Sequence, residues 1–201
     1  MEENYRYWLI HQKLFPFHFL SQLDLNRFWE RAARRGGLPL AFSQGFNPRP
    51  LFSFGPATPV GVESRVEVFE LTLTQNWLEE EIKEKLNREG PAELAIQRIS
   101  RAPSNRKLSR AIRGLRYSFW FSSSLADSSL EEGLSLPAGI EWEKKEFLAS
   151  SGFVLSFWFK GEKVFSSPIK FVEYLSSILN GLLPEKIIKE EVFLETEGSK
   201  S

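Results

Sequence analysis

YRYWLIH at residues 5–11 and SQLDLNRFWERAARRGG at residues 21–37 predict a strand followed directly by a helix. The first segment divides between two faces, one with Arg6, Trp8 and Ile10 and the other with Tyr7, Leu9 and His11, as in a strand. The second begins with Ser21, a residue type that caps helices, and ends at Gly36-Gly37. Between them lies an apolar stripe at helical spacing: Leu25, Phe28, Trp29, Ala32 and Ala33.

The same order of elements is expected twice along the chain. In the first half, strands are predicted at 5–11, 67–74 and 93–99 and extended segments at 38–43 and 51–54, with a second helix at 77–89 capped by Asn76. In the second half, strands are predicted at 117–121, 140–147, 153–159 and 187–194, with helices at 125–134 and 168–180. This order is typical of ferredoxin-like domains. We therefore predict an α+β protein of two tandem ferredoxin-like (βαββαβ) modules with antiparallel sheets, comprising an N-terminal module at 1–102, a basic linker at 103–116 and an acidic C-terminal module at 117–201.

Composition excludes several classes of function. The chain has 201 residues and no cysteine, so it holds no disulfide, thiolate metal site or iron–sulfur cluster. Its two histidines, His11 and His18, do not have the spacing of a metal pair, and no catalytic motif or cofactor fingerprint occurs. No apolar run approaches the ~20 residues of a membrane span, and the N-terminus does not resemble a secretory signal. We expect a cytoplasmic protein without a cofactor or a catalytic site.

Charge is distributed unevenly although the net charge is zero. Residues 1–116 carry 18 basic and 13 acidic side chains, whereas residues 117–201 carry 8 and 13. Every arginine lies at or before Arg116. Because the planar guanidinium group recognises phosphate and stacks on bases, the first half is the expected binding half.

Four arginines lie on the polar side of the predicted first helix: Arg27, Arg31, Arg34 and Arg35. Their spacing projects them to one side, where only Asp24 and Glu30 oppose them. Such a face suits phosphate binding. The alternative is a solvated helix face, on which the helix dipole favours Arg34 and Arg35 near the C-terminus.

The segment SQGFNPRP at residues 43–50 predicts a stiff loop, because its two prolines restrict the backbone. A stiff loop that presents Gln44, Asn47 and Arg49 suits the binding of a phosphate or a base edge, and Phe46 can stack on a base. The alternative is that the loop only shapes a bulged hairpin, with Arg49 in solvent.

Residues 97–116 contain seven basic residues and no acid. Four of them complete the predicted binding surface: Arg106, Lys107, Arg110 and Arg113. An exposed basic segment beside a junction of two domains favours nucleic acid. The alternative is that this run docks within the chain onto acids of the second half, among them Asp127, Glu131, Glu132, Glu141 and Glu143.

Several segments together resemble the radical-SAM-linked protein family, a domain of unknown function (2344). They are Phe19–Leu25, Glu30–Ala32, Arg34–Arg35, Gly37–Pro50 and Pro59–Ser64, with Ser-Gln-Gly-Phe-Asn-Pro-Arg-Pro the most specific. Gln22 stands where a histidine is familiar in the family. Members are similar to domains fused to, or encoded beside, cobalamin-binding radical SAM enzymes. The resemblance implies a companion of such an enzyme, and the chain is not that enzyme itself because it lacks the cysteines of a cluster.

Together these observations favour a non-catalytic accessory protein that binds or presents RNA through its arginine-rich surface. Its expected partners are a radical SAM enzyme and RNA, with no membrane. An alternative is a protein-interaction module that docks the enzyme without contacting RNA. A third hypothesis is an RNA-processing, endoribonuclease-like enzyme in which His18 acts as a general base.

Overall fold

A computed structural model describes residues 4–122, 135–148, 152–160, 168–179 and 181–195. The first half contains β1 (Tyr5–Lys13), α1 (Gln22–Arg35), β2 (Phe52–Phe54), β3 (Glu63–Leu73), α2 (Glu79–Arg88) and β4 (Ile96–Arg101). The second contains α3 (Leu108–Ala111), β5 (Ile112–Phe121), β6 (Ile140–Leu148), β7 (Gly152–Lys160), α4 (Pro168–Ile178) and β8 (Lys186–Leu194). Short 3-10 turns occupy Phe17–Phe19 and Ala92–Leu94.

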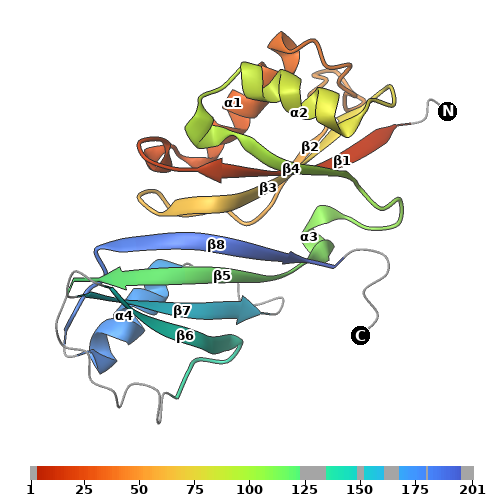
Figure 1. Cartoon of the computed structure of the whole chain (residues 1–201). Helices are drawn as coiled ribbons and strands as arrows, with labels where there is room; N and C mark the ends of the chain where they lie inside the picture. Colours follow the sequence, from red (N-terminus) through yellow and green to blue (C-terminus); the bar gives the residue numbers. More distant parts are fainter. Residues whose placement is uncertain (1–3, 123–134, 149–151, 161–167, 180, 196–201) are drawn as a thin grey trace.

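The strands form one mixed sheet in the order β4-β1-β3-β8-β5-β7-β6, with β2 paired to β3. Every pairing is antiparallel except that of β3 with β8. That parallel pairing is short, joining Glu63 to Ile188 and Ser64 to Lys189. Figure 1 shows the two halves one above the other, with β3 and β8 at their junction. The described residues thus form an α+β fold with four helices and a large, mostly antiparallel sheet.

The helix α1 begins and ends as its sequence predicts. The Ser21 hydroxyl accepts a hydrogen bond from the Asp24 amide at 3.2 Å, and Gly37 after the helix has a positive φ of 67°. The buried face of the helix carries Leu25, Trp29, Ala32 and Ala33. In Figure 1, α1 and α2 both lie above the sheet of the first half, away from the second half. The opposite, solvent-facing side of α1 carries its arginines.

Strand β1 has apolar side chains buried on both faces. Tyr7 and Leu9 pack under α1 and α2, whereas Trp8 and Ile10 belong to a larger core that continues into the second half. In that core, Phe171 of α4 contacts the rings of Phe119, Phe157 and Phe159. One hydrophobic core therefore spans the junction between the halves.

Two local features differ from a regular capped helix and a regular strand. Asn76 does not cap α2, which starts at Glu79 with no side-chain cap. The Oδ1 of Asn76 instead accepts a hydrogen bond from the Tyr7 hydroxyl at 3.0 Å. Residues 38–43 form no regular strand, since they make only isolated bridges, Leu40 to Leu73 and Phe42 to Pro50. The helix predicted at 125–134 lies entirely outside the described residues.

Charged side chains are buried at the junction. Glu67 of β3 and Lys189 of β8 form an ion pair of 3.3 Å with side chains 5% and 1% exposed. Lys13 donates to the Thr58 carbonyl at 3.2 Å, and the Thr58 hydroxyl donates to Glu67. Burial alone raises the pKa of Glu67, but Lys189, His11 and two hydroxyl groups lower it to about 2. Glu67 is therefore ionised at neutral pH.

His11 lies beside this network and is uncharged at neutral pH. Its Nε2 accepts a hydrogen bond from the Trp29 indole at 3.2 Å. Burial lowers the pKa of His11 to about 4, against the opposing effect of Glu67. The unfolded chain takes up a proton at this histidine near pH 6.5, whereas the folded chain resists until about pH 4.

We therefore expect the free energy of unfolding to decrease as pH falls from 6.5 to 4, by about 3 kcal/mol from His11 alone. The measurement is urea unfolding across that range for the parent chain and for His11→Gln, whose amide does not titrate. The variant is expected to have a shallower pH dependence. Parallel curves for the two proteins would contradict this assignment.

Candidate nucleic-acid interface

The solvent side of α1 presents arginines with few acidic partners. Arg35 is engaged by Glu89 at 2.7 Å, and Arg27 lies 3.8 Å from Asp24 in an exposed pair. Arg31 and Arg34 are exposed and form no ion pair with any described residue. Exposed ion pairs contribute little stability, so the guanidinium group of Arg27 remains available to a ligand, as do those of Arg31 and Arg34.

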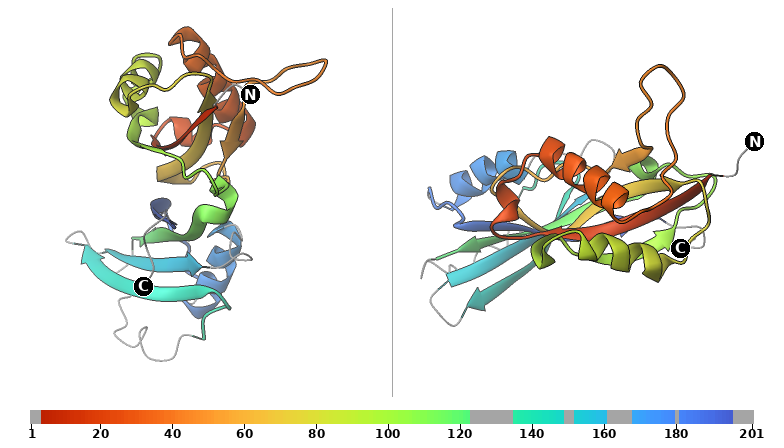
Figure 2. Two further views of the ribbon diagram at one scale, coloured as in Figure 1. Left: turned by 90° about the vertical axis from the view of Figure 1, so that its right-hand side faces the viewer. Right: turned by 90° about the horizontal axis from the view of Figure 1, so that it is seen from above.

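The segment between α1 and β2 projects from the body as a long loop (Figure 2). Its base is closed by the Ser43 amide, which donates to the Arg49 carbonyl at 2.8 Å, and by the Arg49 amide, which donates to the Ser43 hydroxyl at 3.0 Å. Gly45 has a φ of 130°, a conformation that side-chain-bearing residues rarely adopt. Phe46 beside it is fully exposed. We call residues 43–49 the projecting loop.

Arg34 connects the arginine side of α1 to the projecting loop. Its guanidinium carbon lies 5.2 Å from the centre of the Phe42 ring, at the base of the loop. Gln44, Asn47 and Arg49 are exposed along the loop. The structure thus brings Arg34 next to the loop, and Arg31 lies about one helical turn away.

The predicted basic linker is largely folded into the second half. Leu108 and Ala111 of α3 are buried, and Arg113 lies in β5. Arg106 and Arg113 both pair with Glu195, at 3.0 and 2.6 Å. Lys107 and Arg110 are exposed and form no ion pair with the described residues.

The acidic residues expected to bind this linker form ion pairs with only part of it. Arg116 in β5 pairs with Glu143 at 3.0 Å and also with Glu191, whereas Glu141 pairs with Lys160. Asp127, Glu131 and Glu132 lie outside the described residues. Intramolecular docking therefore accounts for Arg106, Arg113 and Arg116, and it leaves Lys107 and Arg110 exposed to solvent.

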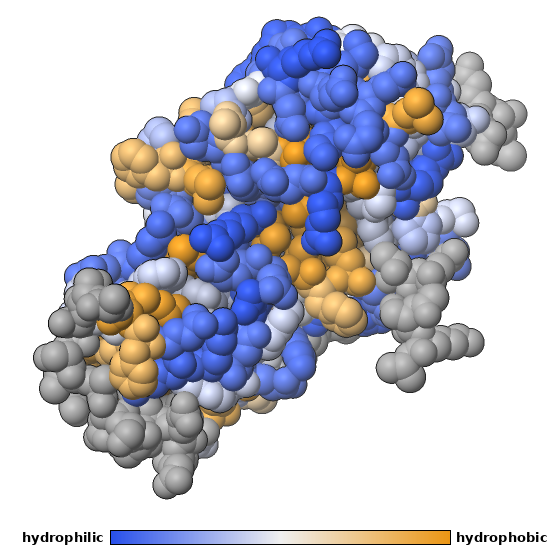
Figure 3. All heavy atoms as spheres, in the orientation of Figure 1, coloured by the Kyte–Doolittle hydropathy of each residue, from blue (hydrophilic) through white to orange (hydrophobic). Residues whose placement is uncertain are grey.

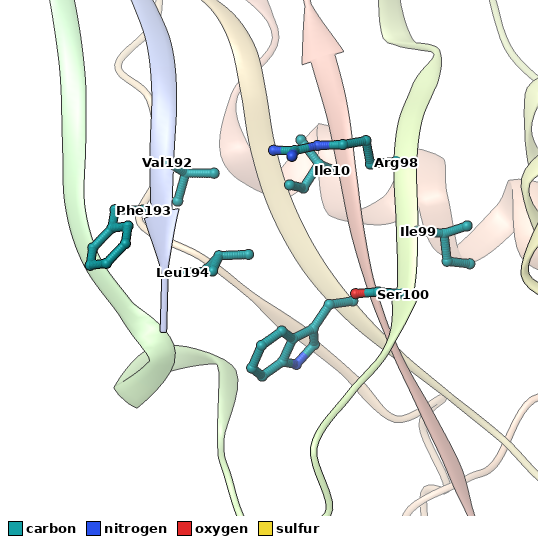
Figure 4. A pocket seen from close by; sticks show the side chains of 8 residues that line it. Ile10, Arg98, Ile99, Ser100, Val192, Phe193 and Leu194 are labelled. Atoms are coloured by element: carbon teal, nitrogen blue, oxygen red, sulfur yellow. The ribbon is translucent and has the colours of Figure 1, made fainter. Parts of the chain in front are cut away.

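A groove of about 330 Å³ lies between the halves. It is lined by Trp8, Ile10, Arg98, Ile99, Ser100, Val192, Phe193 and Leu194. Figure 4 shows Arg98 extending from β4 across the groove toward the side chains of β8. Figure 3 shows hydrophobic side chains gathered along the same junction. Arg98 is exposed and forms no ion pair with a described residue.

A groove at the junction of two domains is a common expectation, but its lining does not follow from the sequence. Arg98 belongs to the basic run, whereas Trp8 and Phe193 are far apart in sequence and have only the pattern of strand residues. The pairing of β3 with β8 brings them to one place. A single sequence carries no signal for that pairing.

The described residues contain neither a metal-binding cluster nor a membrane-spanning helix. No group of three or more histidine, cysteine or acidic side chains there is arranged to hold a metal ion. In the same part of the chain, no helix is long and apolar enough to cross a membrane.

Comparison with known proteins identifies a family. Residues 6–152 match the model of a family described as an uncharacterized protein conserved in bacteria (DUF2344). The chain belongs to this family. No curated protein matches the chain. A solved structure of a microcompartment protein from Desulfitobacterium hafniense aligns over 96% of each chain with 10% identity and a TM-score of 0.24. A TM-score this low does not indicate a shared fold or function. Neither description mentions a radical SAM enzyme.

Because Phe46 is fully exposed, we expect Phe46→Ala to leave stability unchanged within about 0.5 kcal/mol. The measurement is the urea midpoint of the variant against that of the parent chain. A clear loss of stability would show that the Phe46 ring packs onto the body, and would contradict its assignment to a binding surface.

Proposed function

We propose that this DUF2344 protein is a non-catalytic accessory protein that binds single-stranded RNA. The arginine side of α1 and the projecting loop form the main contact surface, with Arg98 and Arg110 at the junction as further cationic sites. The observation that carries the proposal is the combination of three exposed arginines that form no ion pair with a described residue, Arg31, Arg34 and Arg49, with a fully exposed Phe46.

The chemistry of these side chains fits an RNA strand. Guanidinium groups bind phosphates in a bidentate manner, and an exposed aromatic ring stacks on an unpaired base. The base of the projecting loop is fixed by one backbone hydrogen bond and one from a backbone amide to the Ser43 hydroxyl, so its donors lose little entropy on binding. Duplex nucleic acid offers no unstacked base to Phe46, and for that reason we favour single strands.

The strand orders support our interpretation of the fold as two tandem ferredoxin-like modules. In the first half the order is β4-β1-β3-β2, and in the second it is β8-β5-β7-β6. Numbered within each half, both read 4-1-3-2. We propose that each half is one ferredoxin-like module and that the groove forms where the two modules meet.

The radical SAM association rests on the resemblance of the segments around residues 19–64. We propose that the protein acts in the cytoplasm beside such an enzyme and presents RNA to it. The chain has no cysteine to hold a cluster, so the radical chemistry belongs to the partner.

Charge reversal of the α1 arginines tests RNA binding. We expect Arg31→Glu with Arg34→Glu to weaken binding to a short single-stranded RNA by about ten-fold or more, and binding of the parent chain to weaken as salt increases. Fluorescence anisotropy with labelled RNA at low and moderate salt measures both effects.

The matched control places the same charge change on α2. Lys83→Glu with Arg88→Glu alters two cations that, among the described residues, form ion pairs only with Glu80 and Glu84 on their own helix. This variant is expected to retain most of the affinity. Equal losses in the two double variants, or binding that does not respond to salt, would overturn the proposed site.

A second function is docking of a partner protein, which the exposed Phe46 and the apolar groove favour. Phe46→Ala and the reversal of Arg31 and Arg34 separate the two functions in a pull-down with the radical SAM enzyme. We expect the arginine variant to lose RNA and retain the enzyme. If both variants lose binding to the radical SAM enzyme and the parent chain binds no RNA, the function is docking of the partner protein.

A further inference from the structure

A second hollow, of about 350 Å³, lies at the junction on the side of the turn that precedes α1. Its apolar lining comes from both halves: Phe15, Val60, Val62, Ile169, Pro184 and Ile187. The Gly61 amide donates to the His18 carbonyl at 3.0 Å and holds the loop before β3 against the turn. The accessible lining is about equally polar and apolar, and a hollow of this size with apolar walls and a few convergent polar groups can hold a small molecule.

His18 is the polar group of this hollow that has no partner. Its side chain is only 8% exposed, yet Nδ1 is buried without a hydrogen bond, and Nε2 makes none with the described residues. The His18 ring contacts two aromatic rings, with its centroid 4.0 Å from that of Phe19 and 5.6 Å from that of Phe15. A buried nitrogen without a partner is costly, and because Nδ1 has almost no accessible surface, a ligand in the hollow would reach the ring through Nε2.

Electrostatics of the hollow differ from those of the arginine surface. Glu63 and Lys186 pair at 2.9 Å across the junction, and Glu185 adds a further negative charge. Burial lowers the pKa of His18, so its ring is neutral at pH 7 and offers one donor and one acceptor. The hollow thus disfavours a phosphate or a carboxylate.

We propose that this hollow binds an uncharged planar heterocycle, with Phe15 at its mouth stacking on the ring and His18 forming hydrogen bonds to its edge. A nucleobase has this chemistry. It can come from a free nucleoside or from a base of a bound RNA strand. The second source rests on the proposed function, whereas the first does not.

The test uses the full chain and the four common uncharged ribonucleosides as probes. The chain has two histidines, so the ring signals of His18 and His11 can be followed together by NMR during each titration. His11 is buried and accepts a hydrogen bond from Trp29, so its signals serve as the internal reference. We expect at least one nucleoside to shift the His18 signals and leave those of His11 in place.

Variants of the lining show whether those shifts report this site. Phe15 is 66% exposed, so Phe15→Ala is expected to fold normally and to weaken nucleoside binding by about five-fold or more. His18→Ala is expected to abolish binding. No His18 shift with any nucleoside, unaltered affinity in Phe15→Ala, or equal shifts with inorganic phosphate would overturn the proposal.

Arg31→Glu with Arg34→Glu separates this site from the RNA surface. The double variant is expected to bind nucleosides normally, because neither arginine lines the hollow. If RNA affinity also falls in Phe15→Ala, the base belongs to the RNA strand. If RNA affinity is unchanged while nucleoside binding falls, the ligand is a free nucleoside. Both outcomes support the hollow as a binding site for a base. If the parent chain does not bind RNA at all, the proposed function fails, but the nucleoside titration still tests the hollow.

Discussion

The ion pair between Glu67 and Lys189 is the interaction on which the arrangement of the two halves depends. The β3 and β8 strands share only two paired positions, so backbone pairing alone fixes the junction weakly. At that junction a buried carboxylate meets Lys189, and Lys13 lies within the same network through Thr58. A charge buried this deeply is tolerated only with its partner in place, so the network selects one relative position of the halves.

That fixed position determines which surfaces are continuous. The groove exists because residues of β8 face residues of β1 and β4 across it, and the hollow next to His18 exists because the start of β8 lies beside the turn before α1. The arginine side of α1 and the projecting loop need only the first half. The proposed RNA surface can therefore survive changes at the junction that abolish the groove and the hollow.

Local sequence signals predicted most elements and much of the exposed surface. Ser21, the apolar stripe and Gly36-Gly37 bounded α1, and the glycine and prolines of residues 43–50 predicted a loop that the structure describes as exposed. Asn76 failed as a cap because the Tyr7 hydroxyl, distant in sequence, uses its side chain. The buried charges were equally hidden. Lys13, Glu67 and Lys189 are ordinary polar residues of strands until the topology brings them together.

The most direct test of this account is a double-mutant cycle on Glu67→Gln and Lys189→Met, measured as free energies of unfolding in urea. Each single change leaves a buried group without its partner, and we expect each to cost about 3 kcal/mol or more. The double variant is expected to cost clearly less than the two losses combined. Additive losses would show that the two side chains act independently, and would contradict the role given to this ion pair in holding the halves together.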